Sequence, residues 1–397
     1  MNVTSDFECG NGKNISQVAP GHWRIDEEGE KAPYCKYFCV KVEAGDDGGP
    51  VRLDVYPDPA MGEEGRAGML GHYPAPLWFS EDEMSHWVRV TDRWPGVETY
   101  GLDRLSTRVV VPPKGSLYVA SNVVVPWSKL KAWAAELGRR GAAVDSLGNS
   151  FEGRDIPRLH LPSTGSGKAL TVLALSGQHP SEHCGPLAAC GIADFLCSSH
   201  PEAAAIRERC EVWLVPMINV DGNVHGRNGW TMEDVNPCSD FEGACDGVEP
   251  RATEDRLLWN WLSGELRPDV AFNFHGYLGT RCFADYPYDG CYVLERPEEA
   301  YRSSERRVLY EAVRDTLFWD TAGLSARATP GILTPRMLSY NLARAIGTIV
   351  PFYEINHAFC GVQGAKRKGA DVFRAVMRTV LKGWTFLLAG CGPPAYS

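Results

Sequence analysis

Two side chains with metal-binding chemistry follow directly after an apolar run near the middle of the chain. Residues 169–175 are apolar or β-branched, which predicts a buried strand, and Ser176-Gly177 then breaks it. His179 and Glu182 come next, and their spacing of three places both side chains on one side of a turn that enters a helix. Such a pair also occurs by chance. An imidazole and a carboxylate nevertheless suit zinc, which in catalytic sites takes three protein ligands and keeps a fourth position open.

The neighbouring His183 offers an alternative assignment of the ligands. The sequence also reads His-x-x-Glu-His, a zinc-binding pattern in which both histidines are ligands and the glutamate is the base. That pattern requires one continuous helix through both histidines. Pro180 is tolerated only in the first turn of a helix, and Gly177 places His179 on a loop. We therefore predict His179 and Glu182 as the ligands and leave His183 out.

The strand, the Gly-x-His-Pro-x-Glu motif and the helix after it resemble the zinc metallocarboxypeptidase family of carboxypeptidase A and the cytosolic carboxypeptidases. The resemblance extends over roughly residues 145–390. It implies one zinc ion and a third ligand that ends another buried strand, and residues 269–277 provide His275 in that position. It also implies a general-base glutamate at the end of a late strand, where Glu354 closes an apolar run.

Three further features of the family follow the first ligands in the expected order. The family's Asn-Pro-Asp-Gly segment corresponds to residues 219–222, where Val220 replaces the proline; Arg227 comes next, and then Asp-Val-Asn-Pro at residues 234–237. By this resemblance, Glu354 would take a proton from the water that zinc activates and pass it to the leaving nitrogen. Arg227 would stabilise the developing oxyanion, with a solvated loop arginine as the alternative. Asp234 would accept a hydrogen bond from His179, or would only cap a loop.

One departure from the family pattern concerns the carboxylate end of a substrate. Pro237 occupies the place of the arginine that clamps a terminal carboxylate, and its side chain offers no donor. Asn236 retains the other half of the clamp, but one amide does not replace a bidentate guanidinium. Either Arg281 supplies the missing cation, or the substrate carries no free carboxylate there. Tyr340 is a candidate phenol donor to the substrate, with core packing as an equal alternative.

The elements that must position these residues fall into two regions. Residues 1–125 contain short runs rich in valine and aromatic residues, separated by glycine, proline and aspartate clusters, which predicts an all-β antiparallel sandwich domain. The cytosolic carboxypeptidases resemble this arrangement too. Residues 126–397 alternate strands with helices and predict an α/β catalytic domain, whose mainly parallel mixed sheet is covered by helices and carries the site at strand carboxyl ends. The predicted helices span residues 128–140, 186–198, 254–266, 303–318 and 370–389.

Composition restricts the partners and the compartment. The net charge of −10 disfavours nucleic acid because phosphates would be repelled. We expect no membrane partner, since no run reaches the roughly 18 apolar residues of a membrane span. The N-terminal residues do not resemble a secretory signal, and the 13 cysteines are odd in number and scattered. We therefore expect a cytoplasmic protein with reduced thiols, while the oligomeric state stays open.

These observations predict a zinc-dependent hydrolase that cleaves a peptide amide bond, with a carboxypeptidase as the nearest class. Two alternatives stay open. Pro237 allows an amidase or deacylase with the same catalytic residues, and a non-catalytic module that only binds peptide would share the same fold. The ligands and Glu354 are all present, which favours an enzyme, because a binding module is free to lose them.

Overall fold

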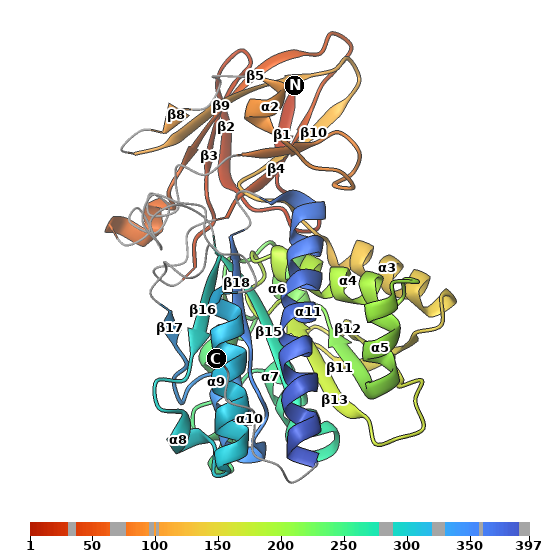
Figure 1. Cartoon of the computed structure of the whole chain (residues 1–397). Helices are drawn as coiled ribbons and strands as arrows, with labels where there is room; N and C mark the ends of the chain where they lie inside the picture. Colours follow the sequence, from red (N-terminus) through yellow and green to blue (C-terminus); the bar gives the residue numbers. More distant parts are fainter. Residues whose placement is uncertain are drawn as a thin grey trace.

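The computed structural model describes residues 1–30, 37–63, 77–94, 99–100, 103–277, 289–319, 330–356 and 360–388. Figure 1 shows a region of strands that contains the N-terminus, stacked above a larger region in which helices cover a sheet. The strand-rich region ends near residue 120, and the first long helix begins at Trp127. The change from strands to alternating strands and helices therefore lies where the sequence pattern changes.

Two five-stranded sheets make up the N-terminal region. One has the order β1-β4-β10-β6-β7 and the other the order β2-β3-β5-β9-β8. The strands of the first sheet are β1 (Asn2–Thr4), β4 (Cys39–Glu43), β6 (Trp78–Ser80), β7 (Val88–Arg89) and β10 (Ser116–Ala120). Those of the second are β2 (Lys13–Ala19), β3 (His22–Asp26), β5 (Gly49–Tyr56), β8 (Thr99–Tyr100) and β9 (Leu105–Val111).

The two sheets pack face to face around one apolar core. Alternate residues of β4 and β10 point inward from the first sheet, and alternate residues of β5 and β9 do so from the second, as the period of two in a half-buried strand requires. The pairs between neighbouring strands are antiparallel except for β3 and β5, which run parallel from His22–Arg52 to Asp26–Tyr56. This parallel pair adds a detail that the alternating pattern of the sequence does not specify.

An eight-stranded mixed sheet forms the centre of the larger region. Its order is β11-β12-β14-β13-β15-β18-β16-β17. The strands are β11 (Ala143–Asn149), β12 (Asp155–Leu161), β13 (Leu170–Ser176), β14 (Cys210–Val215), β15 (Val270–Tyr277), β16 (Gly290–Val293), β17 (Gly331–Ile332) and β18 (Phe352–Asn356). The four central strands β14, β13, β15 and β18 are parallel to one another, whereas β11, β12 and β16 join by antiparallel pairs.

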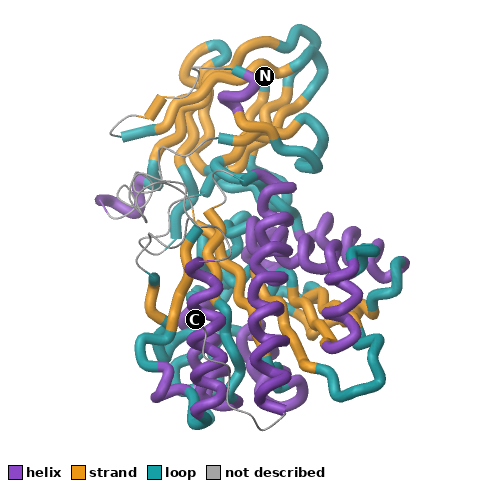
Figure 2. Tube along the Cα trace, in the orientation of Figure 1, coloured by secondary structure: helices purple, strands orange, loops and turns teal. Residues whose placement is uncertain are grey.

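Helices cover this sheet, as Figure 2 shows. The longer ones are α3 (Trp127–Arg139), α4 (Cys184–Leu196), α5 (Pro201–Arg209), α7 (Thr253–Asn260), α9 (Ser304–Trp319), α10 (Leu338–Ile346) and α11 (Gly361–Leu388). Shorter helical segments are α2 (Val90–Arg93), α6 (Val220–Val224), α8 (Pro297–Ala300), η1 (Pro59–Met61), η2 (Pro237–Ser239), η3 (Ala244–Asp246) and η4 (Trp261–Leu266). Each helix predicted from the sequence is present, but α5 and α10 were not predicted and α11 begins nine residues earlier than expected. Among the described residues, no helix is both long and apolar enough to cross a membrane.

Two glycines allow α4 and α11 to cross at backbone distance. A Cβ atom added to Gly191 of α4 would lie 1.9 Å from the carbonyl oxygen of Lys366, and one added to Gly369 of α11 would lie 2.4 Å from Cα of Ala188. Neither obstacle is the flexible end of a side chain, so these helices cannot keep this separation with larger residues. The crossing holds α4, and with it the loop that precedes α4, against the sheet.

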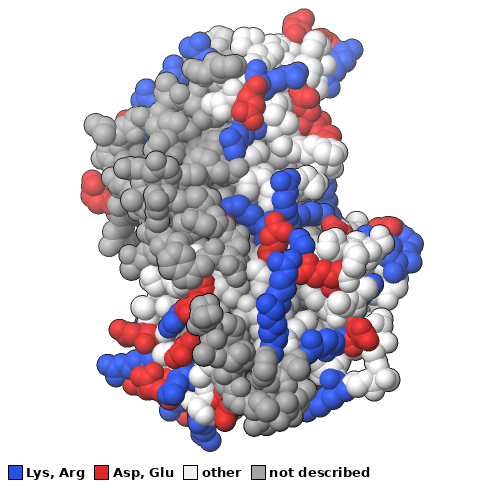
Figure 3. Space-filling model, in the orientation of Figure 1, with Lys and Arg blue, Asp and Glu red and all other residues white. Residues whose placement is uncertain are grey.

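Ion pairs reinforce the position of α11. Figure 3 shows lysine and arginine side chains gathered along the exposed face of this helix. Lys366 pairs with Asp194 of α4 at 3.0 Å, and Arg374 and Arg378 both pair with Glu202 of α5. These basic residues are therefore used within the fold, where they connect α11 to its neighbours.

We expect Gly191→Ala to lower the free energy of unfolding by about 2 kcal/mol or more, because the added methyl group overlaps the backbone of α11. Thermal and urea unfolding would measure the change. Gly264→Ala is the matched control. It also adds a methyl group to a helical segment, but nothing lies within 4 Å of that position, so the change should be neutral or stabilising by about 0.5 kcal/mol. Equal stabilities of the two variants would contradict the packing explanation.

Candidate metal centre and active site

Three neighbouring parallel strands carry the predicted site residues at their carboxyl ends. The strand β13 leads into the loop with His179 and Glu182, its neighbour β15 contains His275, and the next strand β18 contains Glu354. Carboxyl ends of parallel strands meet at one edge of a sheet, so residues far apart in the sequence become neighbours there. The order of the strands thus brings the four predicted residues to one place.

The loop after β13 has the conformation that the sequence predicts. Gly177 has φ +70°, and a Cβ atom there would lie 2.8 Å from Cα of Met217. The helix α4 begins only at Cys184, so no helix runs through both His179 and His183. His183 lies away from the cluster, where its Nδ1 accepts a hydrogen bond from Val125 N, and burial lowers its pKa to about 3. The alternative with two histidine ligands from one helix is therefore wrong.

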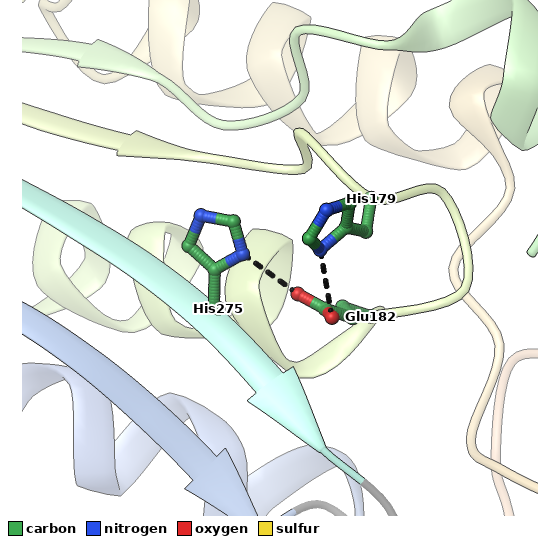
Figure 4. A group of neighbouring side chains, drawn as sticks. All are labelled: His179, Glu182 and His275. Carbon is green, nitrogen blue, oxygen red and sulfur yellow. Dashed lines mark hydrogen bonds and ion pairs between the residues drawn. The ribbon is translucent and has the colours of Figure 1, made fainter. Parts of the chain in front are cut away.

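His179, Glu182 and His275 converge on one point, as Figure 4 shows. The two carboxylate oxygens of Glu182 lie between the imidazoles, with Oε1 2.9 Å from Nδ1 of His179 and Oε2 2.9 Å from Nδ1 of His275. All three side chains are buried, and their ligand atoms lie within 4.8 Å of one another. Gly276 N donates a further hydrogen bond to Oε2 of Glu182 at 3.1 Å.

Amide side chains behind the histidines hold the rings in place. Nε2 of His275 lies 3.0 Å from Oε1 of Gln178, which also accepts a hydrogen bond from Asn273 Nδ2 at 2.9 Å. Nε2 of His179 lies 3.2 Å from Oδ1 of Asn236. These contacts leave Nδ1 of each ring facing Glu182. The sequence interpretation gave Gln178 no role, although its place beside Gly177 and His179 was a signal that it lies near the ligands.

The donor set fits zinc. Two imidazole nitrogens and one carboxylate are a ligand combination of catalytic zinc sites, and a hydrogen bond from the second ring nitrogen is the usual support for a histidine ligand. Phe352 adds an apolar wall, because its ring stacks on His275 with 4.6 Å between ring centroids. The three residues can therefore hold one metal ion, as catalytic zinc sites do with three protein ligands.

Glu354 is next to His275 across the sheet. The strands β15 and β18 pair in parallel register, and His275 and Glu354 are direct partners. Partners in register point to the same face of a sheet, and Phe352, two residues before Glu354, already contacts His275 on that face. The half-buried Glu354 carboxylate thus lies on the same face of the sheet as the His275 ring.

The structure gives Arg227 and Asp234 a contact that was not predicted. Nη2 of Arg227 donates to Oδ1 of Asp234 at 2.8 Å, and Nε donates to Oε1 of Glu30, from the N-terminal sheets, at 2.9 Å. Burial would lower the pKa of Arg227, but Glu30 and Asp234 together raise it, so the guanidinium stays charged. Nε2 of His179 lies beside Oδ1 of Asn236. The expected hydrogen bond from His179 to Asp234 stays a prediction.

The three residues predicted to bind substrate lie in different parts of the chain's structure or outside its described residues. Asn236 is beside the metal cluster, where its Oδ1 faces His179 and also accepts from Cys238 N at the start of η2. Tyr340 lies on α10 and lines a cavity of about 310 Å³ with Leu294, Arg296 and Pro335; the described residues that line it include none of the three cluster residues. Arg281 lies outside the described residues. The roles of all three in binding substrate stay predictions.

Asp255 is a buried carboxylate in the first turn of α7. It is fully buried, and neither of its oxygens has a hydrogen-bond partner among the described residues. Burial raises its pKa well above the ordinary 3.8, and the nearby charges of Asp240, Glu254 and Glu233 raise it further. The sequence gave no signal for this group, since an acidic residue in the first turn of a helix is normally exposed.

Comparisons with known proteins agree with this geometry. Residues 131–311 match the family model described as zinc carboxypeptidase. The fold resembles that of a metallo-carboxypeptidase from Burkholderia cenocepacia, with a TM-score of 0.78 and 18% identity over 96% of this chain and 98% of that one. It also resembles a metallo-carboxypeptidase from Pseudomonas aeruginosa in complex with (2-guanidinoethylmercapto)succinic acid, with a TM-score of 0.76 and 17% identity over 96% of this chain and all of that one. The resemblance in fold thus extends over the N-terminal sheets as well as the α/β region.

Curated relatives are similar over a shorter segment. The chain is 28% identical over 211 residues to a protein of Ajellomyces dermatitidis named inactive metallocarboxypeptidase ECM14, which covers 43% of this chain. It is 30% identical over 222 residues to the protein of the same name from Sclerotinia sclerotiorum. The chain spans about a third of the length of these relatives, 34% and 36% respectively. The predicted resemblance to the zinc carboxypeptidase family is confirmed.

We expect the protein to bind about one equivalent of zinc, and His275→Ala to lose it because only two ligands remain. Elemental analysis after dialysis and the rise in Tm on adding zinc would measure this. His86→Ala is the control, since that ring is 86% exposed on the N-terminal sheets. Gln178→Ala should lower the affinity for zinc about 10- to 100-fold, because the His275 ring loses the hydrogen bond that orients it. Equal zinc contents in wild type and His275→Ala would exclude this cluster as the site.

We expect the free energy of unfolding of Asp255→Asn to increase relative to that of wild type as the pH rises. An acid whose pKa is raised on folding holds its proton longer in the folded state, so its stabilising effect is present at low pH and is lost as the pH rises above about 3.8. The amide does not titrate. Urea unfolding at several pH values between about 4 and 8 would measure the difference, with the exposed Asp46→Asn as control. A difference independent of pH would contradict the raised pKa.

Proposed function

Because residues 131–311 match the zinc carboxypeptidase family model, we propose that this protein hydrolyses an amide bond of a peptide substrate. His179, Glu182 and His275 would hold one zinc ion. The observation that carries the proposal is the register of β15 and β18, which makes Glu354 the direct neighbour of His275 across the sheet. A carboxylate on the same face of the sheet as a histidine of the metal cluster is suited to move protons.

Glu354 and Arg227 have different roles in the proposed reaction. Zinc in a three-ligand site is a Lewis acid that lowers the pKa of a water to about 7. Glu354 would accept the proton released when water attacks the substrate carbonyl, and would then donate it to the leaving nitrogen. Arg227 would stabilise the negative charge that develops on the carbonyl oxygen, because the two carboxylates paired with it keep it charged and fixed.

A second candidate is hydrolysis of an amide whose substrate carries no terminal carboxylate. Pro237 favours it, since η2 begins at this buried residue and its carbonyl oxygen accepts from Gln178 Nε2, so the position contributes no cation. A non-catalytic peptide-binding module is a further possibility that the name of the curated relatives raises. The retained metal cluster and Glu354 favour catalysis over it.

The proposed partner is therefore a peptide or another amide substrate, with neither nucleic acid nor a membrane, and the proposed compartment is the cytoplasm. Burial raises the pKa of the Cys184 and Cys238 thiols beside the site. Both thiols should thus stay neutral and unreactive.

Incubation of the zinc-loaded protein with a peptide pool, half free and half amidated at the C-terminus, would test the proposal by mass spectrometry. We expect Glu354→Gln to lower kcat about 10²- to 10⁴-fold with little change in KM, because it removes proton transfer and leaves the metal ligands in place. Glu265→Gln, an exposed glutamate of η4, should behave as wild type. A chelator should abolish the activity of every form.

The products distinguish the candidates. Loss of single C-terminal residues from free peptides alone would identify a carboxypeptidase. Cleavage that ignores amidation would identify the second candidate, with Pro237 as its cause. Peptide binding to the zinc form without turnover of any peptide would reject catalysis and leave the binding module.

A further inference from the structure

Glu30, from the N-terminal sheets, is inserted into the catalytic region. It lies four residues after the end of β3 at Asp26, and its carboxylate accepts four hydrogen bonds from a segment about 200 residues later in the chain. The donors are Nε of Arg227 at 2.9 Å and the backbone N–H groups of Asn228, Gly229 and Trp230 at 2.7, 3.0 and 2.8 Å. The side chain is only 6% exposed. A carboxylate with so many N–H donors is held in one orientation.

Glu30 and Asp234 hold the guanidinium of Arg227 from two sides. Glu30 binds Nε and Asp234 binds Nη2, while Nη1 has the sulfur of Met232 at 3.9 Å. Two carboxylates on different nitrogens fix the plane of the guanidinium as well as its position. Nη1 is therefore the nitrogen least committed to strong acceptors, and it is the one suited to meet a substrate oxygen.

The segment that Glu30 binds is connected directly to the metal-ligand loop. The carbonyl oxygen of Asn228 accepts from Ser181 Oγ at 2.6 Å, and Ser181 lies between the ligands His179 and Glu182 in the sequence. Asn219 Nδ2 donates both to the carbonyl of Gln178 and to that of Trp230. Glu30 is thus two hydrogen bonds away from the loop that carries two metal ligands.

A cavity separates the two regions beside this contact. Its volume is about 510 Å³, and it is lined by Asn11, Glu28 and Glu30 on one side and by His225, Arg227 and Asp234 on the other. Asn11 Nδ2 donates to the carbonyl of Gly226, and Asn228 Nδ2 donates to that of Glu28, so an amide side chain of each region binds the backbone of the other region. The N-terminal region therefore lines part of the space that Arg227 borders.

We propose that Glu30 is a positioning residue for the reaction, through which the N-terminal sheets orient Arg227 toward the substrate. This inference rests on the proposed function, in which Arg227 stabilises the developing oxyanion. It gives the N-terminal region a part in catalysis beyond packing, because the site lacks a fixed Arg227 without it. A carboxylate that served only to hold two domains together would not need the arginine as one of its donors.

Kinetics of three variants would test the inference. We expect Glu30→Gln to lower kcat about 10- to 100-fold with little change in KM, since Arg227 acts on charge that appears in the transition state. Glu30→Asp, which keeps the charge, should restore part of the loss. Glu8→Gln is the matched control, because Glu8 also comes from the N-terminal sheets and accepts hydrogen bonds from Ser128 N and Oγ across the same interface. Thermal unfolding of each variant would show that it is folded.

A double-mutant cycle with Arg227→Met separates positioning from general stability. If Glu30 acts through Arg227, then Glu30→Gln should add little to the loss of about 10²- to 10³-fold expected for Arg227→Met alone. Additive losses, or equal kcat values for Glu30→Gln and Glu8→Gln, would overturn the inference while leaving the proposed function intact.

A measurement that does not depend on catalysis tests the orientation of Arg227 by Glu30 separately from the proposed function. In ¹⁵N–¹H spectra, the Nε–H of Arg227, assigned by its absence in Arg227→Met, should exchange slowly in wild type and in Glu8→Gln and fast in Glu30→Gln. Slow exchange in Glu30→Gln would overturn the inference even if the protein hydrolyses nothing. Fast exchange together with an inactive wild type would reject the proposed function and uphold the orientation of Arg227 by Glu30.

Discussion

The burial of one carboxylate sets the requirements for the rest of this site. The side chain of Glu182 is only 6% exposed, and a charged group removed from water is tolerated only where donors or a cation surround it. Two imidazoles and the backbone N–H of Gly276 meet that need. These donors come from the loop after β13 and from the end of β15, so the sheet order, the turn at Gly177 and the start of α4 must all be correct at once.

Much of this arrangement is readable from the sequence because it depends on local patterns. An apolar run that ends in a polar residue identifies a buried strand and the side chain at its carboxyl end, and this applies to β13, β15 and β18. Five of the seven longer helices are readable from their patterns as well. The start of α11 is an exception. Residues 361–369 contain three glycines, which disfavour a helix in the sequence. Gly369 nevertheless belongs to α11, where its lack of a side chain lets it lie against the backbone of Ala188.

The remaining features depend on contacts that no local pattern records. Glu30 lies in an acidic stretch that is typical of a solvated loop, and only the fold brings it to Arg227. Asp234 has a positive φ of 57°, which belongs to a turn, and it accepts a hydrogen bond from Arg227 that its place in a motif does not predict. Tyr340 lies on α10, a helix that the sequence pattern did not predict, and it lines a cavity with Leu294 and Arg296.

The long sequence separations within the site have a consequence for the synthesis of the protein. Glu182 and His275 are 93 residues apart, and Glu354 comes 79 residues after that. Proteins fold from the N-terminus during synthesis, so the sandwich strands and Glu30 are made long before Arg227. The strand β18 follows β13 and β15 in the chain, so Glu354 is the last of these site residues to be translated. In the proposed reaction the set of reactive groups is therefore incomplete until β18 has joined the sheet, and the protein would not act on neighbouring unfolded polypeptides before then.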